Sequence, residues 1–235
     1  MVNEKLVHQR DTDLHVLHTV SNIIDSHAGM RFIVTGSYSI EALTGQVATH
    51  NDIDGNVFTH RLGEAWSVVR GLDCRRIGSL SLQLVQEKSD GLNFVLAPEI
   101  GQGSARDLEF RFIETVKPSQ DDLQIFRLIN RSGEELFEVP TETALLKDSH
   151  GREYWFRVKA LSYAIATWAI RLSGVLPNQR RPVRDTDFEH FGILLRQQYQ
   201  QDEVIRAIKY HPQMVDGISE IEVYNMALNA SLLRS

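Results

Sequence analysis

Residues 31–58 constrain the fold more than any other stretch, because they join a strand, a Gly-Ser turn, a short helix and an Asp-Ile-Asp pair. The β-branched and aromatic run Arg31–Thr35 stops at Gly36, which predicts a buried strand. We expect Ser37 to be the N-cap of a helix that Gly45 ends. A helix N-terminus presents free backbone N–H groups and a positive dipole end, so this turn is suited to a phosphate group.

The acidic pair that follows the helix predicts a metal site beside the phosphate-binding turn. Asp52 and Asp54 are two residues apart on an expected strand, so both side chains project on one face, while Ile53 points to the core. We expect both carboxylates to face the phosphate turn. Two like charges this close are unfavourable without a cation, and Mg²⁺ typically takes one or two carboxylates plus phosphate oxygens. The segment therefore predicts a site for Mg²⁺ and a nucleotide phosphate.

This arrangement resembles the nucleotidyltransferase superfamily that includes DNA polymerase β, whose hallmark is Gly-Ser, a short helix and Asp-x-Asp on the next strand. The resemblance implies that Gly36 and Ser37 hold the nucleotide phosphates. It also implies a third metal-binding acid on a later strand between apolar neighbours. Glu109 is preferred for that position, and Asp107, on the same face, remains the alternative.

Two observations weigh against this interpretation. Taken singly, a Gly-Ser pair is usually a turn and an Asp-x-Asp pair is usually a loop or a cap. The family also usually follows the pair with an apolar residue, whereas Gly55 stands here and predicts either a bulge or a close approach to ligand. The order and spacing of the motifs favour the functional interpretation.

Alternating patterns predict further strands near residues 81–86, 92–96, 107–113, 123–129 and 136–139. Helices are expected at 11–27, 62–69, 141–146, 153–172, 185–200, 202–210 and 218–233, with Thr141 as a possible cap and Trp155 and Phe156 in the core. We therefore predict an α+β fold with a mixed sheet flanked by helices. Residues 1–140 would form a nucleotidyltransferase catalytic domain and residues 141–235 a helical C-terminal domain.

The C-terminal half resembles the helical domain of abortive-infection-type nucleotidyltransferase toxins. Lys159 and Asp187 match residues of that domain, which implies that they contact the nucleotide. Thr186 and His190 depart from the pattern. A surface lysine and a helix-capping aspartate are the ordinary alternatives.

Composition limits the location and the partners. A net charge of −6 argues against a broad nucleic-acid surface, although Arg180, Arg181 and Arg184 could form a local phosphate-binding patch. The single cysteine, Cys74, excludes an intrachain disulfide and a cysteine-rich zinc cluster. No apolar run is long enough to span a membrane and the N-terminus lacks a signal-peptide core, so we expect a cytoplasmic protein without membrane contact.

The family resemblance implies Mg²⁺-dependent transfer of a nucleoside monophosphate from a nucleoside triphosphate, such as ATP, to an acceptor hydroxyl. The acceptor stays open between a small molecule such as an antibiotic, a tRNA end and a protein hydroxyl. Toxin-type relatives suggest an antitoxin partner. Two alternatives remain. One is a catalytically degenerate protein that binds a nucleotide or a partner, and the other is a plain structural domain.

Overall fold

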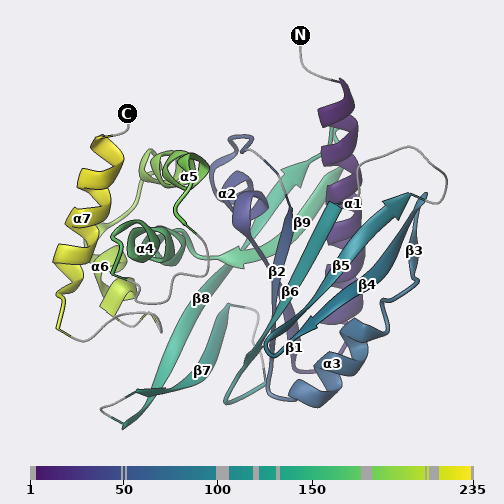
Figure 1. Cartoon of the computed structure of the whole chain (residues 1–235), viewed down its shortest axis with the longest axis horizontal. Coiled ribbons are helices and arrows are strands. Elements are labelled where there is room, and N and C mark those ends of the chain that lie inside the picture. The colour runs from purple at the N-terminus through teal and green to yellow at the C-terminus, as the bar shows by residue number, and fades with distance from the viewer. Residues whose placement is uncertain are drawn as a thin grey trace.

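The computed structural model describes residues 4–48, 50, 52–98, 106–118, 122–130, 133–175, 182–209, 211 and 217–233. Within this part, helices and strands alternate from α1 to β3, consecutive strands follow as far as β9, and helices make up the C-terminal end (Figure 1). The elements are α1 (Glu4–Asp25), β1 (Met30–Thr35), α2 (Gly36–Thr44), β2 (Ile53–Thr59), α3 (Leu62–Arg70), β3 (Arg76–Ile77), β4 (Leu80–Lys88), β5 (Gly91–Pro98), β6 (Arg106–Glu114), β7 (Leu123–Asn130), β8 (Gly133–Lys147), β9 (Glu153–Lys159), α4 (Leu161–Leu172), α5 (Asp185–Leu195), α6 (Gln201–Lys209) and α7 (Glu220–Leu232). No helix among the described residues has the length and apolar character needed to cross a membrane.

The described strands form one mixed sheet in the order β3-β4-β5-β6-β2-β1-β9-β8-β7. β2 and β6 are parallel, as are β1 and β9, and the remaining neighbours are antiparallel. β1 and β9 meet through the pair Val34 and Val158. The predicted α+β class and mixed sheet are confirmed.

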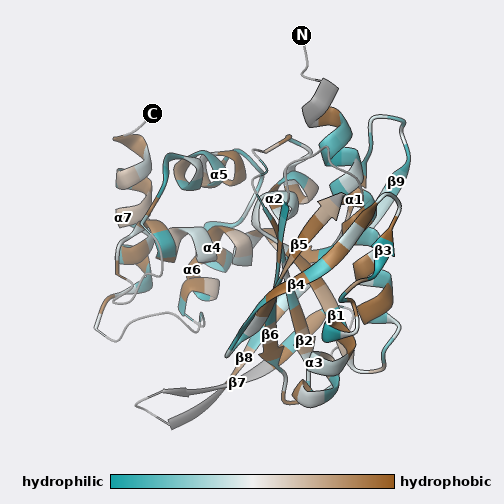
Figure 2. Ribbon diagram, turned by 45° about the vertical axis from the view of Figure 1, so that its right-hand side comes forward, coloured by the Kyte–Doolittle hydropathy of each residue, from teal (hydrophilic) through white to brown (hydrophobic). Residues whose placement is uncertain are grey.

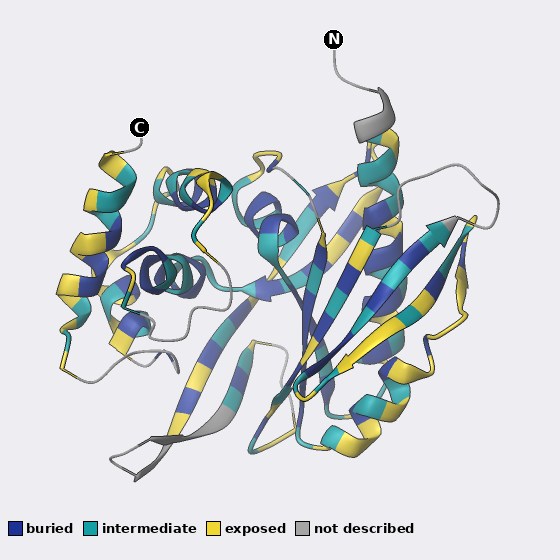
Figure 3. Ribbon diagram, viewed as in Figure 1, coloured by how far each residue is buried: buried dark blue, intermediate teal, exposed yellow. Residues whose placement is uncertain are grey.

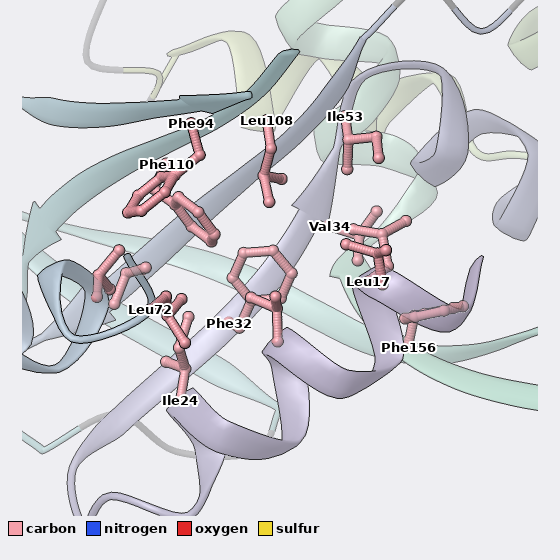
Figure 4. Close-up of a cluster of buried hydrophobic side chains, with 14 of the residues drawn as sticks. Leu17, Ile24, Phe32, Val34, Ile53, Leu72, Phe94, Leu108, Phe110 and Phe156 are labelled. Carbon is pink, nitrogen blue, oxygen red and sulfur yellow. The ribbon is translucent and has the colours of Figure 1, made fainter. Parts of the chain in front are cut away.

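The main core lies between one face of the sheet and the helices α1 and α3. Phe32 of β1 lies in the middle of this cluster, Leu17 and Ile24 enter it from α1, and Phe110 of β6 packs beside the Phe32 ring (Figure 4). These side chains are fully buried, and the centroids of the two phenylalanine rings are 5.8 Å apart. Burying a large apolar side chain contributes about 1.5–3 kcal/mol, so this face of the sheet is the main source of stability.

A second core joins α4, α5, α6 and α7 on the other side of the molecule, where these helices carry hydrophobic residues (Figure 2) and turn buried residues toward one another (Figure 3). α2 contributes to both cores, because Tyr38 belongs to the first and Ile40 to the second. Both side chains are at most 1% exposed. α2 is therefore held from two sides.

The helices predicted at 141–146 and at the start of 153–172 are wrong. Residues 141–147 are the second half of β8, and Glu153–Lys159 is strand β9. β8 pairs with β7 up to Pro140 and with β9 from Thr141 onward. A proline, which lacks the N–H of a ladder bond, is tolerated where the strand changes partner.

The sheet thus continues to Lys159, and the C-terminal helices α4, α5, α6 and α7 begin only after that residue. In β9 the side chains alternate, so Phe156 is buried while Trp155 is 56% exposed instead of lying in the core. The division into domains at residue 140 stays a prediction.

Gly55 is explained by packing. The pairing of β2 with β1 and with β6 runs through Gly55 without a register shift, so the predicted bulge is absent. A Cβ at Gly55 would lie 2.1 Å and 2.2 Å from carbons of the Phe32 ring. Glycine is needed here because the Phe32 ring fills the space over the strand.

We expect Gly55→Ala to destabilise the protein by about 1–3 kcal/mol, the usual cost of overpacking a core. Gly63→Ala is the matched control, because a Cβ at Gly63, in helix α3, meets nothing within 4 Å. Alanine is favoured over glycine in a helix by up to about 1 kcal/mol. Urea unfolding of both variants tests this, and equal midpoints for Gly55→Ala and the parent would contradict the packing explanation.

Candidate functional site

The turn between β1 and α2 is tight. α2 begins at Gly36, with Thr35 in the N-cap position and no side-chain cap, so the predicted capping role of Ser37 is wrong. Gly36 has φ +64°, a conformation that favours glycine. A Cβ at Gly36 would lie 2.7 Å from Oδ2 of Asp54, so the absent side chain lets this carboxylate approach the turn. The first N–H groups of α2 have no partner within the helix.

Asp54 lies in the middle of a row of side chains across one face of the sheet. Its register partners are Thr35 of β1 and Glu109 of β6, and Glu109 is in turn paired with Asn93 of β5. We call Asn93, Glu109, Asp54 and Thr35 the transverse row. Since Val34 is paired with Val158, Lys159 follows at the same level of β9. The structure thus brings together Gly36, Asp54, Glu109 and the end of β9.

Asp52 and Asp107 lie at the edge of this arrangement. Asp52 is exposed and directly precedes β2. Asp107 is exposed and precedes the first β2–β6 pair, which joins Ile53 to Leu108. Glu109, as the direct neighbour of Asp54, is therefore better placed than Asp107 to share a ligand with it.

The donor set suits Mg²⁺, because carboxylates and an amide oxygen are hard oxygen ligands. Among the described residues, no group of three His, Cys, Asp or Glu side chains is close enough to hold a metal by itself. Mg²⁺ commonly uses one or two carboxylates and takes its other ligands from phosphate and water. The buried Oδ1 of Asn93, beside Glu109, has no hydrogen-bond partner among the described groups. It is a further oxygen available on this face.

Two cations that the sequence did not single out hold Glu109. Its Oε1 lies 3.3 Å from Lys88 Nζ and 3.1 Å from Arg111 Nε. Lys88 comes from the end of β4, and Arg111 lies one alternation along β6 from Glu109. No motif in the sequence links these positions, since sheet pairing alone brings them together.

Lys159 lies in a half-buried, positively charged environment. Its Nζ is 5.4 Å from the centroid of the Tyr163 ring at the start of α4. Burial lowers the pKa of Lys159 to about 8, and the positive charge of Arg111 adds to the shift. Burial also lowers the pKa of His211 to about 3, with a further contribution from Lys159. An anion placed here would compensate the positive charge of Lys159.

Asp187 has the contacts of a structural residue. It is 1% exposed, and its Oδ2 accepts from Arg171 Nη2 at 3.0 Å and from the backbone N–H of Arg184 at 2.9 Å. These bonds fix the start of α5 against α4. Its contact with a nucleotide stays a prediction, and Arg180 and Arg181 lie outside the described residues.

A buried polar network, also missed from sequence, converges on Ser37. His50 Nδ1 lies 2.9 Å from Ser37 Oγ, and His50 Nε2 lies 2.6 Å from Glu41 Oε2. Burial alone would raise the pKa of Glu41, but hydrogen bonds from His50 and Arg10 outweigh it and hold that pKa below its usual value. Arg10 Nε donates to Glu41 at 2.9 Å. The network therefore contains an ionised, buried carboxylate.

The comparisons with known proteins concern the fold. No family model matches the chain, and no curated protein matches its sequence. An antigenic nucleotidyltransferase-like protein from Paracoccidioides brasiliensis has a similar structure, with TM-score 0.50 and 12% identity over 95% of this chain and 89% of that one.

Two further solved structures are similar. MenT4, a nucleotidyltransferase toxin from Mycobacterium tuberculosis H37Rv, gives TM-score 0.45 and 15% identity over 94% of this chain and 91% of its own. JHP933 from Helicobacter pylori gives TM-score 0.48 and 8% identity over 99% and 94% of the two chains. The chain therefore has a nucleotidyltransferase-type α+β fold, as its sequence motifs predicted.

We predict that Lys159→Met raises the free energy of unfolding at pH 7. The folded pKa of about 8 lies below the ordinary value of 10.5, so the unfolded chain binds more protons between these pH values. The charged Lys159 lowers the free energy of unfolding by its full amount below about pH 8. This loss disappears as the pH rises to 10.5. Urea unfolding of both proteins at pH 7, 8.5 and 9.5 should show a shrinking difference. A difference independent of pH would contradict the assigned environment.

Proposed function

We propose that this protein is a Mg²⁺-dependent nucleotidyltransferase that moves a nucleoside monophosphate from a nucleoside triphosphate to an acceptor hydroxyl. One observation carries the proposal. The Asp54 carboxylate lies between the Gly36 turn and Glu109, its register partner on β6. It is so close to the turn that a Cβ added at Gly36 would lie 2.7 Å from Asp54 Oδ2. A phosphate-binding helix N-terminus is thereby adjacent to paired carboxylates.

In this proposal, the backbone N–H groups at Gly36 and Ser37 bind the β and γ phosphates of the donor. Asp52 and Asp54 hold Mg²⁺, and Glu109 completes the metal site or accepts the acceptor's proton. When bound, Mg²⁺ would supply charge stabilisation for the attacking and leaving oxygens. The protein itself orients the donor and places charge.

Lys159 would neutralise the triphosphate. Its pKa is lowered mainly by burial and further by the positive charge of Arg111, and a triphosphate would provide compensating negative charge. The cost of burying this amine is the kind of local instability expected at a functional position. We also propose Asp187 as a nucleotide contact, in addition to its structural bonds with Arg171 and Arg184.

The acceptor class remains a small molecule such as an antibiotic or a tRNA end. An antitoxin partner is proposed from the toxin-type resemblance alone. We infer a cytoplasmic location, where nucleoside triphosphates and Mg²⁺ are available. The exposed thiol of Cys74 agrees with a reducing compartment.

A second candidate function is nucleotide binding without chemistry. It is favoured by the two cations on Glu109, which occupy a carboxylate that the reaction would need. Calorimetry with ATP, GTP, CTP and UTP, with and without Mg²⁺, separates the two functions when pyrophosphate release is followed in parallel. Tight Mg²⁺-dependent binding with no release in the presence of varied acceptors would favour the second.

We expect Asp54→Asn to abolish Mg²⁺-dependent pyrophosphate release while the protein stays folded, because the amide keeps the shape but removes the negative charge. Asp202→Asn, at an exposed position in the first turn of α6, is the matched control and should retain turnover. Release of labelled pyrophosphate from a mixture of the four nucleoside triphosphates measures both. Unchanged turnover in Asp54→Asn would rule out the proposed reaction.

The third carboxylate is tested in the same assay. Glu109→Gln should lose activity and Asp107→Asn should keep it, because Glu109 rather than Asp107 is the register partner of Asp54. The loss should be at least about a hundredfold, as for a general base or a metal ligand. The reverse pattern would transfer the role to Asp107.

A further inference from the structure

His50 joins the two parts of the proposed site. Its ring contacts Ser37 in the turn, and its position is two residues before Asp52. Its backbone oxygen accepts a hydrogen bond from Arg106 Nη1 at 3.1 Å. The ring also stacks on Tyr38 with centroids 3.8 Å apart and planes at 13°. His50 is thus fixed through both its ring and its backbone.

Both ring nitrogens of His50 have a partner. An ionised carboxylate can only accept, so the Nε2 of His50 donates to Glu41. The Nδ1 of His50 shares a hydrogen bond with the Ser37 hydroxyl at 2.9 Å. Ser37 is only 7% exposed. The Ser37 hydroxyl is therefore committed to the network instead of pointing at solvent.

The supports of His50 reach back to α1. Arg10 donates to Glu41, and Arg106 Nη2 and the Tyr38 hydroxyl both donate to Asp13, at 2.6 Å and 2.7 Å. These groups are buried or nearly so, and a satisfied buried network holds its members in one arrangement. His50 is therefore held more firmly than a residue in a loop without such contacts would be.

We infer that His50, oriented by Glu41, is a positioning residue for the phosphate turn. By holding the Ser37 hydroxyl, it fixes the first turn of α2 so that the backbone N–H groups converge on the polyphosphate of the donor. This inference rests on the proposed function and assigns to Ser37 an anchoring role in place of a side-chain bond to phosphate. It makes Ser37, Glu41 and His50 one unit.

Two substitutions at His50 test its contacts with Ser37 and with Glu41 separately. Asparagine places its amide atoms at the position of Nδ1, so His50→Asn can keep the bond to Ser37 and lose that to Glu41. Glutamine places them at the position of Nε2, so His50→Gln can keep the bond to Glu41 and lose that to Ser37. His18→Gln is the matched control, since the contacts of His18 are with Asn22, Tyr154 and Phe156.

The probe is inorganic tripolyphosphate with Mg²⁺, titrated calorimetrically against the full chain, with thermal unfolding measured in parallel. We expect His50→Gln to bind about two- to tenfold more weakly than the parent, the loss of about one hydrogen bond. His50→Asn should bind more tightly than His50→Gln, and His18→Gln should bind as the parent does. A purely structural role would lower thermal stability without this order of affinities.

Ser37→Ala provides an independent measurement. If His50 acts through Ser37, then Ser37→Ala should weaken binding as much as His50→Gln does, and the double variant should be no weaker than either. Tripolyphosphate affinity equal to the parent in Ser37→Ala, or in a folded His50→Gln, would overturn the inference alone. Absence of tripolyphosphate and nucleotide binding by the parent would overturn the proposed function together with it.

Discussion

The close approach of Gly36 to the Asp54 carboxylate is the constraint on which the site depends. Only a residue without Cβ, at positive φ, lets strand β1 turn into α2 directly over β2. α2 is then held by both cores, through Tyr38 on one side and Ile40 on the other. The helix N-terminus and the carboxylate are therefore fixed relative to each other by the packing of the whole molecule.

Positively charged side chains gather around the transverse row. Lys159 is a partly buried amine, and Arg111 adds further positive charge beside it. On the other side, Glu109 already has two cationic partners. A bound polyphosphate would compensate the positive charge around Lys159. Its metal would compete with Lys88 and Arg111 for the Glu109 carboxylate. Stability is thus lower here than an apolar arrangement would give.

The sequence predicted the parts of the site that depend on local pattern. Strand β1, helix α2 and the Asp pair follow from alternation and short motifs, whereas Glu109 was expected from the family resemblance. Sheet pairing shows that Asp54 and Glu109 are neighbours. β8 was misread because Ala144, Leu145 and Leu146 are good helix formers, while its strand form depends on distant partners. The contact of His50 with Ser37 depends on how the intervening loop folds, which no periodicity encodes.

The location of the donor can be seen in a crystal structure of the chain with Mg²⁺ and a nucleoside triphosphate analogue that cannot be cleaved between its α and β phosphates. We expect the β and γ phosphates at the N-terminus of α2 and the metal on Asp52 and Asp54, with Lys159 near the triphosphate. A nucleotide bound elsewhere on the molecule, with the Gly36 turn and Asp54 free of ligand, would contradict this expectation.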